Sequence, residues 1–112
     1  MNSRPQRLEP RQFGLLAEAL GDTPETAISV HLLRRGLCRA YVTGNPERFL
    51  GAVVQDLHAP DEPTAFGADP QILWALLQIV PGWACIEVES GCAAELGQII
   101  SAHTGKQTRR YE

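Results

Sequence analysis

The chain has 112 residues, of which 44% are hydrophobic and 21% are charged, so it can bury a real core within one compact domain. Ten basic against thirteen acidic residues leave a formal net charge of −3, which argues against a nucleic-acid partner and against binding to an anionic membrane surface. The sequence contains no membrane span of ~20 apolar residues and no signal peptide, and its three cysteines cannot all pair within one chain. We therefore expect a soluble protein of the reducing cytoplasm.

The first third of the chain is expected to contain two helices. Residues 1–9 are polar and predict a flexible lead-in. In residues 11–20 the apolar side chains recur at helical spacing, and Gly21 is expected to end that helix. Residues 22–25 combine a capping side chain, a proline and an acid, which predicts the start of a second helix. This second helix is expected to end at Gly36, after two arginines that suit its negative end.

A change of hydrophobic period predicts strands in the middle of the chain. Residues 38–43 and 50–57 are rich in strand-forming side chains, and residues 44–47 have the composition of a turn. The connection is too short for a parallel crossover, so the two strands should form an antiparallel hairpin. Residues 58–63 predict a loop, and residues 64–67 predict a third, short strand.

The segment after Asp69 gives the clearest helix signal in the chain. Asp69 can cap its start, Pro70 suits its first position, and Pro81 ends it. A face this apolar indicates a helix at the centre of the core, or one placed between this domain and another body. The apolar face consists of Ile72, Leu73, Leu76, Leu77, Ile79 and Val80.

The last part of the chain predicts a strand at residues 83–89, a helix at 92–103 and a strand at 107–111. A strand, helix and strand joined by short links form a right-handed β-α-β unit, so these two strands should be parallel. The predicted fold is a single α+β domain over residues 1–112. It has a mixed sheet with an N-terminal helical pair, an antiparallel hairpin and a C-terminal β-α-β unit.

Motifs for metal, nucleophilic or phosphate chemistry are weak. The histidines and cysteines lack the spacing of known metal motifs, and we assign no metal ligand and no catalytic residue. Residues 56–62 place three carboxylates and an imidazole on one loop, which could chelate a divalent ion, although a solvated polar loop is the commoner interpretation. Cys38 and Cys92 have no histidine close in sequence to act as a base. The turn at residues 89–92 carries one glycine and an acid, which makes a poor phosphate cradle.

Glu87, Glu89 and Trp74 are the most informative candidates. Glu87 and Glu89 lie about 7 Å apart on one side of a predicted strand, because side chains two residues apart share a face. That face is either open to water, which is the commoner case, or it lines a cleft in which one carboxylate could act as a general base. Trp74 lies on the less apolar side of its helix, so it is either an edge-of-core residue or an interface anchor.

The order of these elements resembles a known family. After two helices, the sequence RAYV at residues 39–42 and TGNPERFLGAVV at residues 43–54 resemble the start of a GNAT N-acetyltransferase of the subgroup with a divergent N-terminal half. Residues 109–111 resemble the strand that leads from that half into the acetyl-CoA-binding half. The family binds the pyrophosphate of acetyl-CoA with an Arg/Gln-x-x-Gly-x-Gly/Ala loop between a strand and a helix. Residues 34–37 lack that spacing and end a helix, so no active-site residue of the family can be placed here.

The resemblance implies the N-terminal lobe of a GNAT-like acetyltransferase that is catalytically incomplete alone. It implies acetyl-CoA as a cofactor only if a longer protein continues beyond Glu112. The alternative is a small α+β binding or assembly module that forms a homodimer or docks on a protein partner, and a complete small enzyme using Glu87 or Glu89 is a third possibility. We expect association through the strand at residues 107–111 and the helix that carries Trp74, since a free strand edge and an aromatic anchor favour an interface.

Overall fold

A computed structural model describes residues 4–88, 90–104 and 107–110. The described strands form one mixed sheet in the order β1-β2-β3-β4-β5-β6. The strands are β1 (Pro5–Arg7), β2 (Cys38–Asn45), β3 (Arg48–Asp56), β4 (Thr64–Phe66), β5 (Cys85–Val88) and β6 (Gln107–Arg110). The helices are a 3-10 turn η1 (Pro10–Gln12), α1 (Phe13–Leu20), α2 (Ala27–Arg35), α3 (Pro70–Leu77) and α4 (Ser90–Thr104).

The sheet confirms the predicted α+β class and strand directions. β2 and β3 form the antiparallel hairpin, and β4 pairs antiparallel with β3. β5 and β6 are parallel, as the α4 crossover between them requires. β4 and β5 are also parallel, but their pairing consists of a single register position, Thr64 opposite Glu87.

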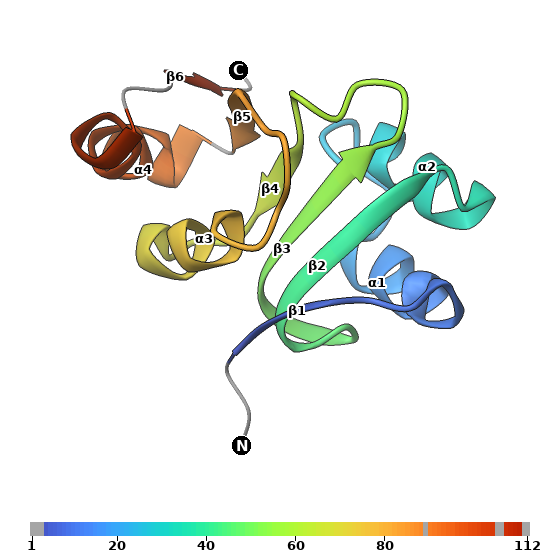
Figure 1. Ribbon diagram of the computed structural model, residues 1–112. Coiled ribbons are helices and arrows are strands. Elements are labelled where there is room, and N and C mark those ends of the chain that lie inside the picture. Colours follow the sequence, from blue (N-terminus) through green and yellow to red (C-terminus); the bar gives the residue numbers. More distant parts are fainter. Residues whose placement is uncertain (1–3, 89, 105–106, 111–112) are drawn as a thin grey trace.

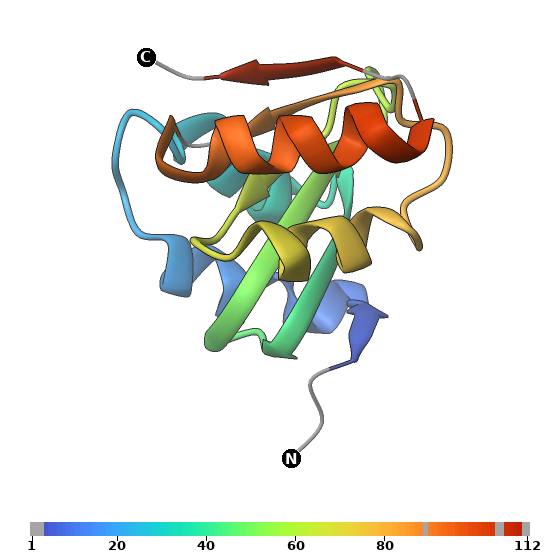
Figure 2. The same cartoon turned by 90° about the vertical axis from the view of Figure 1, so that its left-hand side faces the viewer.

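The helices cover the sheet in two layers. α1 and α2 lie on one face and α3 and α4 on the other, as Figures 1 and 2 show. Alternation along the strands divides the core in two, because successive side chains point to opposite faces. Ala40 and Val42 pack with α1 and α2, whereas Tyr41 and Val53 pack with α3 and α4.

The predicted flexible lead-in at residues 1–9 is wrong for the part that the structure describes. Pro5–Arg7 pairs antiparallel with β2, and the backbone N–H of Leu8 donates to the carbonyl of Ala40 at 2.8 Å. The Leu8 side chain is buried. Three residues are too few to show a strand period, and the pairing comes from the free edge of β2 rather than from the local sequence.

The start of α2 and the end of α3 also differ from the prediction. α2 begins at Ala27 rather than within residues 22–25, because the Thr26 hydroxyl donates to the carbonyl of Gly21 at 2.6 Å and holds the preceding residues in a turn. α3 ends at Leu77 rather than at Val80. The next three amides bond to carbonyls three residues back, which tightens the chain before Pro81.

α3 lies directly on β3 because Gly51 has no side chain. A Cβ atom at Gly51 would lie 2.9 Å from Cγ2 of Ile72 and 3.2 Å from Cδ2 of Leu73. Gly67, which follows β4, has a φ of +148°. A Cβ atom at Gly67 would lie 3.3 Å from the same Cδ2 atom of Leu73. These glycines set the position of α3, and the carboxylate of Asp69 caps its start as predicted, accepting from the Gln71 amide at 2.9 Å.

Candidate functional site

A hollow of about 130 Å³ opens between α2 and the sheet, on the face that carries α1 and α2. Five segments contribute to it: α2, the end of β3, the β3–β4 connection, β4 and β5. We refer to this cavity as the hollow. It is lined by Ile28, Ser29, Leu32, Val54, Asp56, Ala59, Glu62, Thr64 and Glu87.

The apolar wall of the hollow comes from the first two turns of α2. Ile28 and Leu32 lie four residues apart and so share one side of this helix. Leu32 and Val54 belong to the core and form the floor. Ile28 is 72% exposed, the highest value among the exposed large hydrophobic side chains of the described residues. A ligand in the hollow would therefore find an apolar surface that the fold itself leaves in water.

The opposite wall is acidic. Asp56 ends β3, Glu62 lies in the β3–β4 connection, and Glu87 lies on β5; all three are half-buried. Glu87 faces the hollow because its neighbours Ile86 and Val88 point into the core under α3 and α4. The sequence has no lysine or arginine at all between residues 49 and 105, which strengthens the negative potential on this side. The chemistry of the hollow suits a ligand with a cationic end and an apolar stem.

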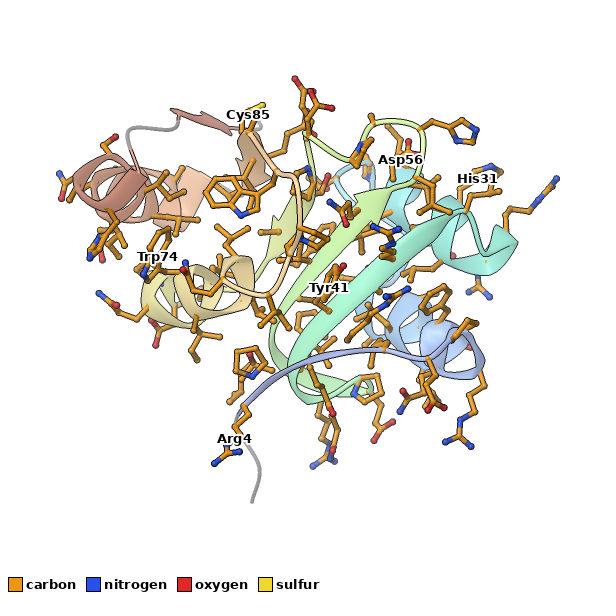
Figure 3. The ribbon with its side chains drawn as sticks, viewed as in Figure 1. Arg4, His31, Tyr41, Asp56, Trp74 and Cys85 are labelled. Atoms are coloured by element: carbon orange, nitrogen blue, oxygen red, sulfur yellow. The ribbon has the colours of Figure 1, made fainter. Side chains whose placement is uncertain are left out.

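The structure separates the three predicted site residues. Glu87 lines the hollow, while Glu89 lies outside the described residues. Trp74 lies on the other side of the sheet, half-buried against the α3 and α4 core, with its ring centroid 5.1 Å from that of His103. In Figure 3 Trp74 lies on α3, to one side of the sheet, and Asp56 lies at the end of β3. Trp74 and Glu87 therefore cannot belong to one site.

The loop that could have bound a divalent ion uses its polar groups within the fold. Asp56 Oδ1 accepts a hydrogen bond from the backbone N–H of His58 at 2.8 Å, which forms a tight turn. The carbonyl of Asp61 accepts from the amides of Ala84 and Cys85 at 2.8 and 3.1 Å. Among residues 4–88, 90–104 and 107–110, no three histidine, cysteine or acidic side chains are grouped to hold a metal ion.

Sequence analysis placed Glu62 in an acidic loop but did not connect that loop with Glu87. Both residues line the hollow, yet they lie 25 positions apart, on two elements joined by backbone hydrogen bonds such as Glu87 N–H to the carbonyl of Pro63 at 3.0 Å. Nothing in the spacing of the two residues indicates that they line one hollow. The local signals were the acidic loop at residues 56–62 and the alternation that placed Glu87 opposite the apolar face of its strand.

Cys38 is a structural residue rather than a nucleophile. It is 5% exposed and lies opposite Asp56 in the β2–β3 register. Burial, and after it the charge of Asp56, raises the pKa of the Cys38 thiol to about 11. The reactive thiolate is therefore nearly absent at neutral pH, and the side chain acts as a small buried hydrophobe.

The turn from β4 into α3 is unsuited to an anion. The first amides of a helix normally attract phosphate, but here the carboxylate of Asp69 already occupies that position, and Pro70 has no N–H to offer. An incoming phosphate would have to displace a bound carboxylate of the same charge.

No helix in the described part of the chain is both long and apolar enough to cross a membrane. Comparison of the chain with protein-family models, with curated proteins and with solved structures finds no match.

Proposed function

We propose that this chain is a non-catalytic, GNAT-like lobe that belongs to a longer acetyltransferase and does not bind acetyl-CoA by itself. The order of elements supports this proposal: a helical pair, an antiparallel hairpin, a short strand, a helix and a β-α-β unit follow one another as the resemblance implies.

The observation that carries the proposal is the Asp69 cap on α3. In the family, a glycine-rich loop between a strand and a helix offers its amides to the pyrophosphate of acetyl-CoA. The turn between β4 and α3 has the sequence GADP, and its acid caps the helix. Negative charge at this point opposes a pyrophosphate, so the nucleotide would need a second lobe.

Titration calorimetry with acetyl-CoA tests the proposal directly. We expect no binding heat with the chain alone, and none with Asp69→Asn, because the amide still caps the helix but no arginine or glycine loop is gained. Binding to a single site at micromolar concentration would contradict the proposal. Reading the coding sequence past Glu112 adds an independent test, since a continuation with an Arg/Gln-x-x-Gly-x-Gly/Ala loop is expected and a stop codon would argue for a self-standing module.

A second candidate function, a module that docks on a basic protein segment, is favoured by the hollow. Its acidic wall and the exposed Ile28 suit the charged head and the aliphatic stem of an arginine. Addition of N-acetyl-arginine amide to the isotope-labelled protein should shift the amide resonances of Ser29, Ala59 and Thr64. Glu87→Gln should weaken these shifts, whereas Glu95→Gln, an exposed acid on α4, should leave them unchanged. Equal shifts in both variants would reject this site.

Self-association is the form of docking that can be tested without a partner. β6 ends the sheet order of the described strands, and an edge strand can pair with another chain. A high protein concentration favours association by mass action. Light scattering at ~100 μM should therefore give a mass near twice 12.3 kDa. Trp74→Ala should return the mass to that of a monomer, and Ile28→Ala, on the opposite face, should not. A monomeric mass for the unaltered chain would reject the homodimer.

A further inference from the structure

Gln55 is a fully buried amide with hydrogen bonds to two different connections. Its Nε2 donates to the carbonyl of Pro60 at 2.8 Å and to the carbonyl of Pro81 at 2.7 Å. Its Oε1 accepts a longer bond of 3.4 Å from the hydroxyl of Tyr41. The side chain is 0% exposed. If either of the two Nε2 hydrogen bonds breaks, the buried N–H group has no water to donate to, and this costs free energy.

The two carbonyls lie in segments far apart in the sequence. Pro60 is in the β3–β4 connection, residues 57–63, and Pro81 is in the α3–β5 connection, residues 78–84. One amide nitrogen therefore fixes both connections to β3. Because the two protons sit on the same nitrogen, a movement of the side chain away from one carbonyl also disturbs the bond to the other.

These two connections reach opposite faces of the sheet. The β3–β4 connection supplies Ala59 and Glu62 to the hollow on the α1 and α2 side. The α3–β5 connection carries Trp83, which is 6% exposed and donates from Nε1 to the carbonyl of Leu77, the last residue of α3, at 3.0 Å. The hydrogen bonds of Gln55 and Trp83 thus connect the segment that lines the hollow with the segment that follows α3.

We propose that Gln55 is a latch that couples the wall of the hollow to the end of α3, so that an occupant which displaces residues 57–63 also loosens residues 78–84 on the other face. The regulatory consequence rests on the proposed use of the hollow as a binding site. The coupling itself is a property of this chain and is tested without a ligand.

The first test uses native-state hydrogen exchange of the unaltered protein. The amides of Ala59 and Glu62 report on the first connection, and those of Ile79 and Val80 report on the second, since each donates to the carbonyl three residues before it. If Gln55 couples the two connections, they open together, and the exchange rates of the two pairs of amides show the same dependence on denaturant concentration. Independent opening of the two connections would overturn the proposal.

The second test displaces the wall deliberately. Ala59→Leu places a larger side chain in the hollow, and we expect exchange at Ile79 and Val80 to accelerate at least tenfold. The same substitution should also shift the emission of Trp83 to the red, measured in a Trp74→Phe background that leaves Trp83 as the one remaining tryptophan.

The effect should depend on Gln55. In Gln55→Met, which has a similar shape but no donor, Ala59→Leu should change exchange at Ile79 and Val80 less than twofold. Thr43→Val is the matched control: Thr43 is buried, and its Oγ1 has no hydrogen-bond partner among the described residues. The full response should persist in that background. An equal response with Gln55→Met would show that the backbone bonds carry the coupling and would overturn the latch. Binding of acetyl-CoA would contradict the proposed function but would leave these measurements unaffected.

Discussion

The two faces of the sheet are each covered by a pair of helices; we call the α3 and α4 side the closed face and the α1 and α2 side, which carries the hollow, the open face. On the α3 and α4 face, α3 contacts β1, β2, β3 and α4, and Gly51 brings it against the backbone of β3. On the other face, α1 and α2 pack on β2 and β3, and the hollow remains between α2 and the parallel strands β4 and β5. A cavity arises where a helical layer is narrower than the sheet beneath it.

The width of the apolar face of each helix explains the difference. α3 has the sequence PQILWALL and buries leucines on neighbouring sides, so it can fill the space above several strands. α2 has the sequence AISVHLLRR, with polar side chains between its apolar ones, and it leaves Ile28 in water. The closed face should therefore dominate stability, and the open face should tolerate change.

The largest effect is expected from removing a core side chain on the closed face. Leu76 is 0% exposed, so Leu76→Ala should lower the free energy of unfolding by about 2–5 kcal/mol, as lost burial and a cavity add together. Ile28→Ala on the open face should change it by less than about 0.5 kcal/mol. Urea denaturation measures both, and similar losses for the two variants would contradict the comparison.

The next largest effect should come from the close contact of α3 with β3. Gly51→Val places side-chain atoms within the contact distance of Ile72 and Leu73 and should cost about 1–3 kcal/mol of unfolding free energy. Gly14→Ala is the matched control. It lies in α1 with no atom within 4 Å of the added Cβ, so it should stabilise the protein by about 0.4–1 kcal/mol. A Gly51→Val protein as stable as the original would show that α3 is not held as tightly as this contact suggests.

The start of α3 gives a smaller effect that separates capping from charge. Asp69→Ala removes the acceptor for the Gln71 amide and should lower the melting temperature, at a cost of about 0.5–2 kcal/mol. Asp69→Asn keeps an acceptor oxygen and should lower the melting temperature far less. Equal losses would mean that the negative charge near the helix dipole, rather than the hydrogen bond, stabilises this end.

The smallest effect concerns Cys38 under the open face. Its thiol pKa is raised to about 11 in the folded protein, so the neutral thiol is favoured over the range in which an unfolded cysteine ionises. The folded state then binds more protons than the unfolded state between pH 9 and pH 11, and the free energy of unfolding should fall across that window.

Chemical denaturation at several pH values measures this dependence. Below pH 9 the contribution of Cys38 should be complete and constant, and Cys38→Ala should show a shallower fall at higher pH. An unchanged slope in Cys38→Ala would assign the pH dependence to other groups.

Much of the fold followed from the sequence, because its signals are local. Asp69 and Pro70 mark the start of α3, Gly36 with a φ of +66° ends α2, and short connections set the strand directions of the hairpin and of the β-α-β unit. Each of these features depends on residues within a few positions of one another. The alternation that places Glu87 opposite Ile86 and Val88 is equally local, and it was enough to nominate one residue of the hollow.

Only the tertiary structure determined what these elements do together. β1 forms because β2 offers a free edge, and no period in three residues could predict that. Gln55 reads as an ordinary polar residue of a strand, yet it is buried because two distant connections bring carbonyls to its amide. The hollow joins α2, β3, β4 and β5, and its acids are neighbours only after folding. Local propensity depends on the chain nearby, whereas a site depends on long-range packing. For that reason the sequence named Glu87 and the acidic loop at residues 56–62 separately and did not place them in one site.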